Sequence, residues 1–177
     1  MEFVILGLLL LKPRTLYELN KTLAEKISLF YSASFGSISS AINKLLEKGW
    51  IELREHIERG RNKKIYTITA AGQSAFHDWL NSAIAPEKVK EPALTRLFFL
   101  GYLDPAQRIA LITQHIASLE AQQITLGQLY SETEAQAIPT ELHDIARFQK
   151  LTLDYGRDYN AFSLAWYRRL LAELQEQ

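Results

Sequence analysis

The chain has 177 residues, which is enough for one medium domain or for two small ones with a shared core. Hydrophobic residues make up 47% and charged residues 23%, the ordinary balance of a water-soluble globular protein. The chain contains no cysteine, which excludes disulfides, thiolate metal sites and a cysteine nucleophile and fits a reducing cytoplasm.

The net charge is zero, but the two halves of the chain differ in sign. Residues 1–80 contain 11 Lys and Arg against 8 Asp and Glu, and residues 81–177 contain 9 against 12. The positive charge is concentrated in one short stretch, which holds Arg54, Arg59, Arg61, Lys63 and Lys64. A polyanionic partner would therefore meet the amino-terminal half.

The apolar run from Phe3 to Leu11 predicts a buried first helix. Its nine residues are too few to span a bilayer. No basic segment precedes the run, and Lys12 and Pro13 follow it, which does not match a secretory signal. We therefore expect no membrane association.

Local signals predict two further helices before residue 50. Pro13 ends the first helix because it has no N–H to donate. Thr15 and Glu18 match a capping box, in which each side chain satisfies a free amide at a helix start. Apolar residues at helical spacing carry the second helix to about Ile27, and Ser34 is the expected N-cap of the third.

The expected third helix has an apolar side and a polar side. The apolar side holds Phe35, Ile38, Ile42, Leu45 and Leu46. The other side carries hydroxyl, amide and ammonium groups, which can bond phosphates or base edges in a DNA groove: Ser37, Ser40, Asn43 and Lys44. A solvated helix face explains the same composition, and the segment that follows favours the groove-binding interpretation.

That segment is predicted to be a two-stranded hairpin with a cationic tip. Gly49 ends the helix as a left-handed cap residue, residues 50–57 and 64–69 favour strands, and residues 59–62 turn the chain. The cations that can neutralise phosphates or enter a minor groove are Arg59, Arg61, Lys63 and Lys64. A charged hairpin alone is usually solvated, but a helix directly before it is typical of a winged helix-turn-helix, so double-stranded DNA is the expected partner.

The carboxy-terminal half is predicted to be all-helical. A linker over residues 85–92 precedes a short apolar helix. Asp104 and Pro105 open a long helix with Ile124 among its apolar positions, which ends near Thr133, and Pro139 restarts the chain. Two long amphipathic helices cannot bury wide apolar stripes against one short helix. The remaining surface predicts a second copy of the chain in a two-fold dimer.

Aromatic residues concentrate in this half. The last helix carries apolar residues at helical spacing from Leu142 to Leu174, many of them aromatic. One interpretation is an apolar pocket for a planar ligand such as a phenolic compound, formed by Phe98, Tyr155, Tyr159 and Trp166. The other is that these rings fill the core and the dimer seam.

No residue pattern indicates catalysis or a metal site. The four histidines, at positions 56, 77, 115 and 143, lack the spacing of metal ligands. The sequence contains no phosphate-binding glycine loop, nucleophile elbow or zinc-protease motif. We therefore expect that the protein is not an enzyme and binds no metal or cofactor.

Five pieces of sequence follow one another at a characteristic spacing in the first part of the chain: Ile5-Leu-Gly-Leu-Leu, Leu16-Tyr-Glu-Leu, Phe35-Gly-Ser-Ile, Leu45-Leu-Glu-Lys-Gly and Arg61-Asn-Lys-Lys-Ile-Tyr-Thr-Ile-Thr-Ala-Ala-Gly. In their order and spacing this part, about 80 residues, resembles the PadR family of bacterial transcriptional regulators. The chain departs from the family where Ser39 and Ser40 replace a tyrosine and a proline, and where Leu16 replaces a glycine. The winged fold therefore carries over, and the operator preference does not.

The carboxy-terminal half resembles the Vir-type helical domain of the longer PadR-type regulators. The resembling marks are Glu91-x-x-Leu94-x-Arg-Leu-Phe-Phe, and Tyr155-Gly156 followed by Trp166. The two resemblances together cover nearly the whole chain.

These observations predict a mainly α-helical protein with a small β-wing. The expected domains are a winged helix-turn-helix DNA-binding domain over residues 1–84, the linker over 85–92 and an all-helical dimerisation and effector domain over 93–177. The resemblance implies a cytoplasmic, homodimeric transcriptional repressor that binds a pseudo-palindromic operator and is released by a small aromatic effector. The alternative is a winged-helix module that binds protein and not DNA.

Overall fold

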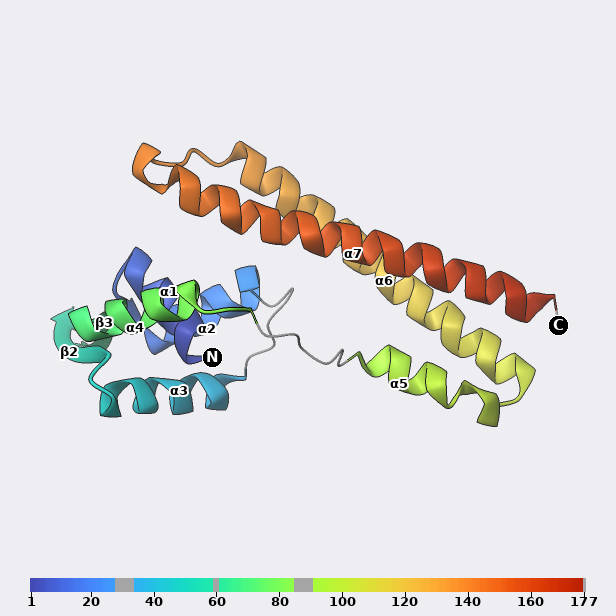
Figure 1. The fold of residues 1–177 in the computed structure, drawn as a ribbon, viewed down its shortest axis with the longest axis horizontal. Coiled ribbons are helices and arrows are strands. Elements are labelled where there is room, and N and C mark those ends of the chain that lie inside the picture. Colours follow the sequence, from blue (N-terminus) through green and yellow to red (C-terminus); the bar gives the residue numbers. More distant parts are fainter. Residues whose placement is uncertain (28–33, 59–60, 85–90, 177) are drawn as a thin grey trace. The chain divides into compact units, whose positions relative to one another are not determined.

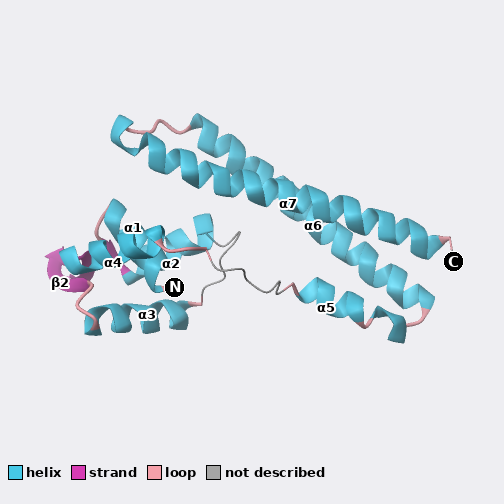
Figure 2. Cartoon of the chain, in the orientation of Figure 1, coloured by secondary structure: helices cyan, strands magenta, loops and turns pink. Residues whose placement is uncertain are grey.

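The computed structural model describes residues 1–27, 34–58, 61–84 and 91–176 (Figure 1). The chain divides into two compact units, Met1–Glu87 and Lys88–Gln177. Within the described ranges, strands occur in the amino-terminal unit alone, as Figure 2 shows. The helices and the small antiparallel sheet confirm the predicted fold class.

The first five elements of the amino-terminal unit are mostly helical. They are α1 (Glu2–Leu11), β1 (Arg14–Thr15), α2 (Leu16–Thr22), a turn of π-helix η1 (Leu23–Ile27) and α3 (Phe35–Glu47). The predicted capping box begins α2: the Glu18 carboxylate accepts from the Thr15 N–H at 2.7 Å, and the Thr15 hydroxyl accepts from the Glu18 N–H at 3.2 Å. The bond from the Thr15 N–H lowers the pKa of Glu18.

The rest of this unit is a hairpin and a helix: β2 (Ile51–Glu58), β3 (Arg61–Ile68) and α4 (Ala70–Asn81). The antiparallel register pairs Ile51 with Ile68, and β1 adds a short strand on the other edge of β3, which gives the order β1-β3-β2. The predicted turn over residues 59–62 is too wide, because residues 61 and 62 already belong to β3. Residues 59 and 60 lie outside the described ranges.

One hydrophobic core joins α1, α2, α3 and the sheet of this unit. Its fully buried members are Ile5, Leu6, Leu19, Leu23, Ile38 and Leu45. Burying one such side chain contributes about 1.5–3 kcal/mol to folding. The core is therefore closed by elements of one chain.

Two glycines and a threonine fix the hairpin to the helices on either side of it. Gly49 has a φ of 65°, the left-handed conformation expected of it. A Cβ on Gly72 would lie 2.1 Å from the carbonyl oxygen of Trp50, so only glycine fits there. The Thr69 hydroxyl donates to the Gly49 carbonyl at 2.7 Å and accepts from the Gly72 N–H at 3.1 Å. These contacts hold the base of the hairpin beside the end of α3.

The carboxy-terminal unit is helical throughout its described part. Its elements are α5 (Pro92–Phe98), a 3-10 turn η2 (Leu100–Tyr102), α6 (Pro105–Ala135), a 3-10 turn η3 (Thr140–Leu142) and α7 (His143–Gln175). Asp104 caps α6, as predicted, with Pro105 in its first turn. Pro92, which the sequence places in the linker, is the first residue of α5.

α6 and α7 lie side by side as an antiparallel pair (Figure 1). The core between them and α5 contains Leu100, Ile112, Ile116, Leu119, Leu164 and Tyr167. Asn160 of α7 is 2% exposed and donates from Nδ2 to the Leu119 carbonyl at 3.2 Å. Since few alternative registers offer a buried amide a partner, this bond fixes how α7 lies along α6.

Two residues predicted on apolar helix sides are exposed instead. Phe35 is 56% exposed and Ile124 is 65% exposed. At about 100° per residue, Phe35 lies about 70° from the centre of the buried side of α3, in its first turn. Ile124 lies about 130° from the side of α6 that faces α7, where Leu126 is buried.

Candidate nucleic-acid interface

α3 separates a buried side from an exposed polar side. The buried residues are Ile38, Ala41, Ile42 and Leu45. Three of the predicted groove residues are exposed: Ser40, Asn43 and Lys44. Among the described residues, none of these three side chains makes a hydrogen bond or an ion pair. Their donors and acceptors are therefore free for a partner.

Ser37 is exposed as well, but its hydroxyl is used to begin the helix. It accepts from the Ser34 N–H at 3.0 Å and donates to the Ser34 carbonyl at 2.7 Å, while the Ser34 hydroxyl accepts from the Ser37 N–H at 3.2 Å. The pair forms a capping box in which serine takes the place of the usual Glu or Gln. Ser37 is thus a helix cap first, with one acceptor position left.

Two residues on the exposed side of α3 were missed in the sequence. Gly36 and Glu47 follow the same helical spacing as Ser40 and Asn43, at i, i+4, i+7 and i+11, so the four form one line along the helix. Gly36 leaves the first turn without a side chain, and Glu47 adds an acceptor-only carboxylate. The spacing itself was the signal that pointed to them.

The two lysines of the hairpin are exposed and point to opposite faces of the sheet. Successive residues of a strand alternate between faces, so Lys64 shares a face with the buried Tyr66, and Lys63 lies on the other face. Arg61 begins β3, its side chain lies outside the described residues, and Arg59 lies outside them altogether.

Two other cations near this surface have partners within the chain. Arg54 pairs with Glu52 at 2.6 Å. Lys48 pairs with Glu2 at 2.5 Å, and its ammonium lies 4.5 Å from the centroid of the Trp50 ring. Lys48 therefore ties the end of α3 to α1, although it neighbours the polar side.

The carboxy-terminal unit presents a second exposed surface, which we call the α7 stripe. It consists of Ile145, Phe148, Leu151, Tyr155, Tyr159 and Phe162, which are between 44% and 72% exposed. The stripe lies about 130° around α7 from the residues that face α6, such as Leu153 and Leu164. α7 thus has two apolar sides, and the described residues of the carboxy-terminal unit cover one of them.

The four candidate effector residues do not form one enclosed site in the described chain. Phe98 is 82% exposed on α5. Tyr155 and Tyr159 lie on the α7 stripe with ring centroids 6.4 Å apart, whereas Trp166 packs against the ring of Tyr167 at 4.9 Å. The Tyr159 hydroxyl donates to Glu91 at 2.6 Å, and this bond raises the pKa of Tyr159 to about 12.

Two family models match the chain, and they fall on the two units. The model of the transcriptional regulator PadR-like family matches residues 5–78, which include α3 and the hairpin. The model described as virulence activator alpha C-term matches residues 89–175. The chain belongs to the PadR-like family of transcriptional regulators.

The PadR-like relatives cover nearly the whole chain. The negative transcriptional regulator PadR of Bacillus subtilis (strain 168) is 27% identical over 180 residues, which span 99% of this chain and 98% of the relative. The crystal structure of B. subtilis PadR in complex with operator DNA matches at 25% identity with a TM-score of 0.82, over 98% of each chain. The complex of the same protein with p-coumaric acid matches at 26% identity with a TM-score of 0.78, over 99% of this chain and 96% of that one.

PadR-like proteins are regulators and not enzymes, which agrees with the expectation from the sequence. In the part of the chain that the structure describes, no group of three or more His, Asp or Glu side chains is arranged to hold a metal ion. Over the same residues, no helix is both long and apolar enough to cross a membrane.

Proposed function

We propose that the protein is a cytoplasmic transcriptional repressor that binds a pseudo-palindromic operator as a homodimer and is released by a small aromatic acid. The observation that carries this proposal is the exposed polar side of α3, followed by a hairpin on which Lys63 and Lys64 are exposed. The operator complex of the 25% identical B. subtilis PadR supports it.

Each exposed residue of α3 suits a defined contact in a major groove. Asn43 can bond an adenine edge with both atoms of its amide, and Lys44 can bond a guanine edge or a phosphate. Glu47 can accept from the amino group of a cytosine. Ser40 and Gly36 have little bulk, so this side of the helix can lie close to the base edges.

The hairpin supplies phosphate contacts that carry little sequence information. Lys63 and Lys64 on opposite faces can reach backbone on either side of the hairpin, and we assign Arg59 and Arg61 the same role. A phosphate accepts hydrogen bonds, so Ser37 can contact one only if its hydroxyl stops donating to the Ser34 carbonyl, and we therefore rank it last.

The homodimer follows from the α7 stripe. A row of six large apolar side chains exposed along one helix is unusual for a monomer, and a two-fold axis lets one stripe cover its own copy. Two copies would place their α3 helices in successive major grooves, about 34–36 Å apart.

For the effector we propose a small aromatic acid held by Phe98, Tyr155, Tyr159 and Trp166 in the assembled dimer. The p-coumaric acid complex of B. subtilis PadR supports the ligand class. Three of the four rings are exposed in the single chain and the ring of Trp166 is half-buried, so a second copy can complete a site around them.

Fluorescence anisotropy with operator-sized duplex DNA over a salt series tests the DNA role. Affinity should fall steeply with salt, and Lys44→Ala should lower the affinity and flatten that slope by about one counterion. Arg169→Ala removes the same charge from an exposed position of α7 and should leave the slope unchanged. Affinity that responds neither to salt nor to Lys44→Ala would contradict DNA binding and favour the protein-binding alternative.

A further inference from the structure

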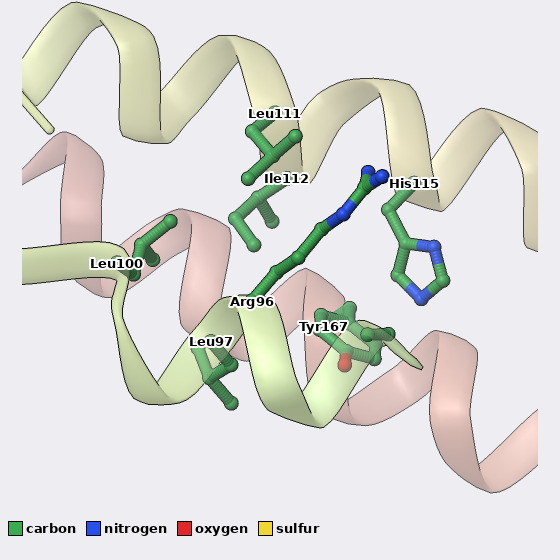
Figure 3. Close-up of a pocket in the computed structure, with 8 residues that line it drawn as sticks. Arg96, Leu97, Leu100, Leu111, Ile112, His115 and Tyr167 are labelled. Carbon is green, nitrogen blue, oxygen red and sulfur yellow. The ribbon is translucent and has the colours of Figure 1, made fainter. Parts of the chain in front are cut away.

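A small cavity lies in the carboxy-terminal unit, between α5, the first half of α6 and the last third of α7 (Figure 3). Its volume is about 50 Å³, and its lining residues are Ala93, Arg96, Leu97, Leu100, Leu111, Ile112, His115 and Tyr167. None of the four candidate effector residues is among them. The cavity is thus a feature separate from the aromatic site proposed above.

Two buried polar atoms at this cavity have no partner among the described residues. They are the hydroxyl of Tyr167, a residue that is 3% exposed, and Nε2 of His115. The two rings pack edge to face with centroids 4.4 Å apart. Buried polar groups are nearly always hydrogen-bonded, so this pair indicates a polar partner other than the described residues.

Tyr167 is equipped to donate to such a partner. Its burial, with a smaller contribution from the nearby Glu91, raises its pKa. The hydroxyl therefore keeps its proton at neutral pH. Nε2 of His115 carries a proton in one neutral tautomer and in the imidazolium, so both atoms can donate to the same acceptor.

Arg96 brings a positive charge to the same place. Figure 3 shows its side chain reaching from α5 across to α6, with the guanidinium on the side of His115. Among the residues described, the Arg96 guanidinium has no hydrogen bond or ion pair. Glu91, whose charge acts on Tyr167, accepts from the Tyr159 hydroxyl at 2.6 Å and does not line the cavity.

We propose that this cavity binds the carboxylate of a small monocarboxylic acid. Arg96 pairs with the carboxylate, and Tyr167 and His115 donate to its oxygens. The leucines and Ile112 enclose a short carbon chain. One water needs about 10–15 Å³ of such volume, so about 50 Å³ has room for roughly three to five non-hydrogen atoms, as in an acid of two or three carbons. The site uses neither α3 nor the hairpin, so it does not rest on DNA binding.

The experiment is an NMR titration of the full-length protein with sodium propionate, against sodium chloride at equal ionic strength. Propionate should shift the resonances of His115 and Tyr167 along a saturating curve with a dissociation constant on the order of 1 mM, and chloride should not. Arg96→Gln should weaken binding about tenfold, because it removes a charge-assisted pair. Tyr167→Phe, which keeps the ring, should weaken it severalfold. Arg169→Gln is the matched control and should bind as the unchanged protein does.

The absence of saturable shifts, or equal binding by Arg96→Gln and Arg169→Gln, would overturn the proposal. A carboxylate can also come from an acidic side chain of a second copy. In that case Arg96→Gln would weaken self-association in sedimentation while propionate has no effect, and the proposal would fail. Because the signals come from His115 and Tyr167 without DNA, the outcome is independent of operator binding and of any aromatic effector.

Discussion

The two units of this chain solve the burial of apolar surface in different ways. The amino-terminal unit closes one core with residues of α1, α2, α3 and the sheet, and its largest core side chains are fully buried. In the carboxy-terminal unit one apolar side of α7 packs against α6, and a second one, the α7 stripe, is exposed. The first unit therefore buries its core within one chain, whereas the second leaves a wide apolar surface exposed among its own described residues.

This difference matches the two roles that we propose for the units, DNA binding by the first and self-association by the second. In the first unit the polar surface of α3 is held in place by a finished core, so its shape is set before any partner arrives. In the second unit the exposed apolar surface is the feature that a second copy of the chain would cover. Variants can be chosen to affect one unit and not the other.

Gly72→Ala should have the largest effect and should act on the amino-terminal unit. The new Cβ would collide with the backbone oxygen of Trp50, and relief requires the hairpin base to move. We expect a loss of about 3 kcal/mol in the free energy of unfolding of that unit, measured by urea denaturation. Gly127→Ala is the matched change in α6, where a Cβ meets nothing within 4 Å. It should stabilise its helix by about 0.5–1 kcal/mol, and equal losses in both variants would refute the steric explanation.

Phe162→Glu should break the other unit's association and leave its fold intact. Phe162 lies on the α7 stripe and is 64% exposed, so a carboxylate costs the monomer little but would be buried in the dimer. Sedimentation equilibrium should show dimerisation weakened about 100-fold or more. Ala161→Glu changes the neighbouring exposed position, about 100° around α7 from Phe162, and serves as the charge control. Unchanged association of Phe162→Glu would show that the stripe is not the interface.

Asn43→Ala should change DNA recognition with no effect on either core. The amide is exposed and unpaired among the described residues, so its loss leaves the stability of α3 nearly unchanged. We expect about tenfold weaker binding to the preferred operator and relaxed selectivity at one base pair, with the same salt slope. Anisotropy against operators changed one base pair at a time measures this. A uniform loss over all sequences would place Asn43 on a phosphate.

Tyr159→Phe should have the smallest effect, about 1 kcal/mol in the stability of the carboxy-terminal unit, because it removes the hydrogen bond to Glu91. The pKa of this tyrosine is raised from 10.0 to about 12 in the folded chain. Its contribution is therefore fully present below pH 10 and is lost as the pH rises towards 12. The difference in unfolding free energy between the two proteins should shrink from pH 9 to pH 12. A difference that stays constant over this range would contradict the assigned bond.

Short-range signals made most of the amino-terminal fold predictable. The cap of α2, the left-handed Gly49 and the Thr69–Gly72 start of α4 each depend on neighbours in the sequence. The sequence predicted Ser34 as an N-cap but not the full capping box, because Ser37 stands where Glu or Gln is usual. For the same reason Ser37 was predicted as a groove contact and not as part of a cap.

Longer-range features were less predictable. Periodicity finds apolar residues along α7 but does not tell which of two sides meets α6, and the side that does includes the polar Asn160 and Ser163. The cavity combines Arg96, His115 and Tyr167, which no sequence spacing connects. Only packing of three helices brings them together.

The buried amide of Asn160 has a consequence for the geometry of the proposed dimer. α6 and α7 are 31 and 33 residues long, and smooth apolar surfaces would let such helices slide. If α7 slipped by one turn along α6, the α7 stripe would move by about 5.4 Å. The two-fold axis of the proposed dimer would move with it. By holding α7 to Leu119, one side chain that touches neither DNA nor a second copy would keep the distance between two half-sites constant.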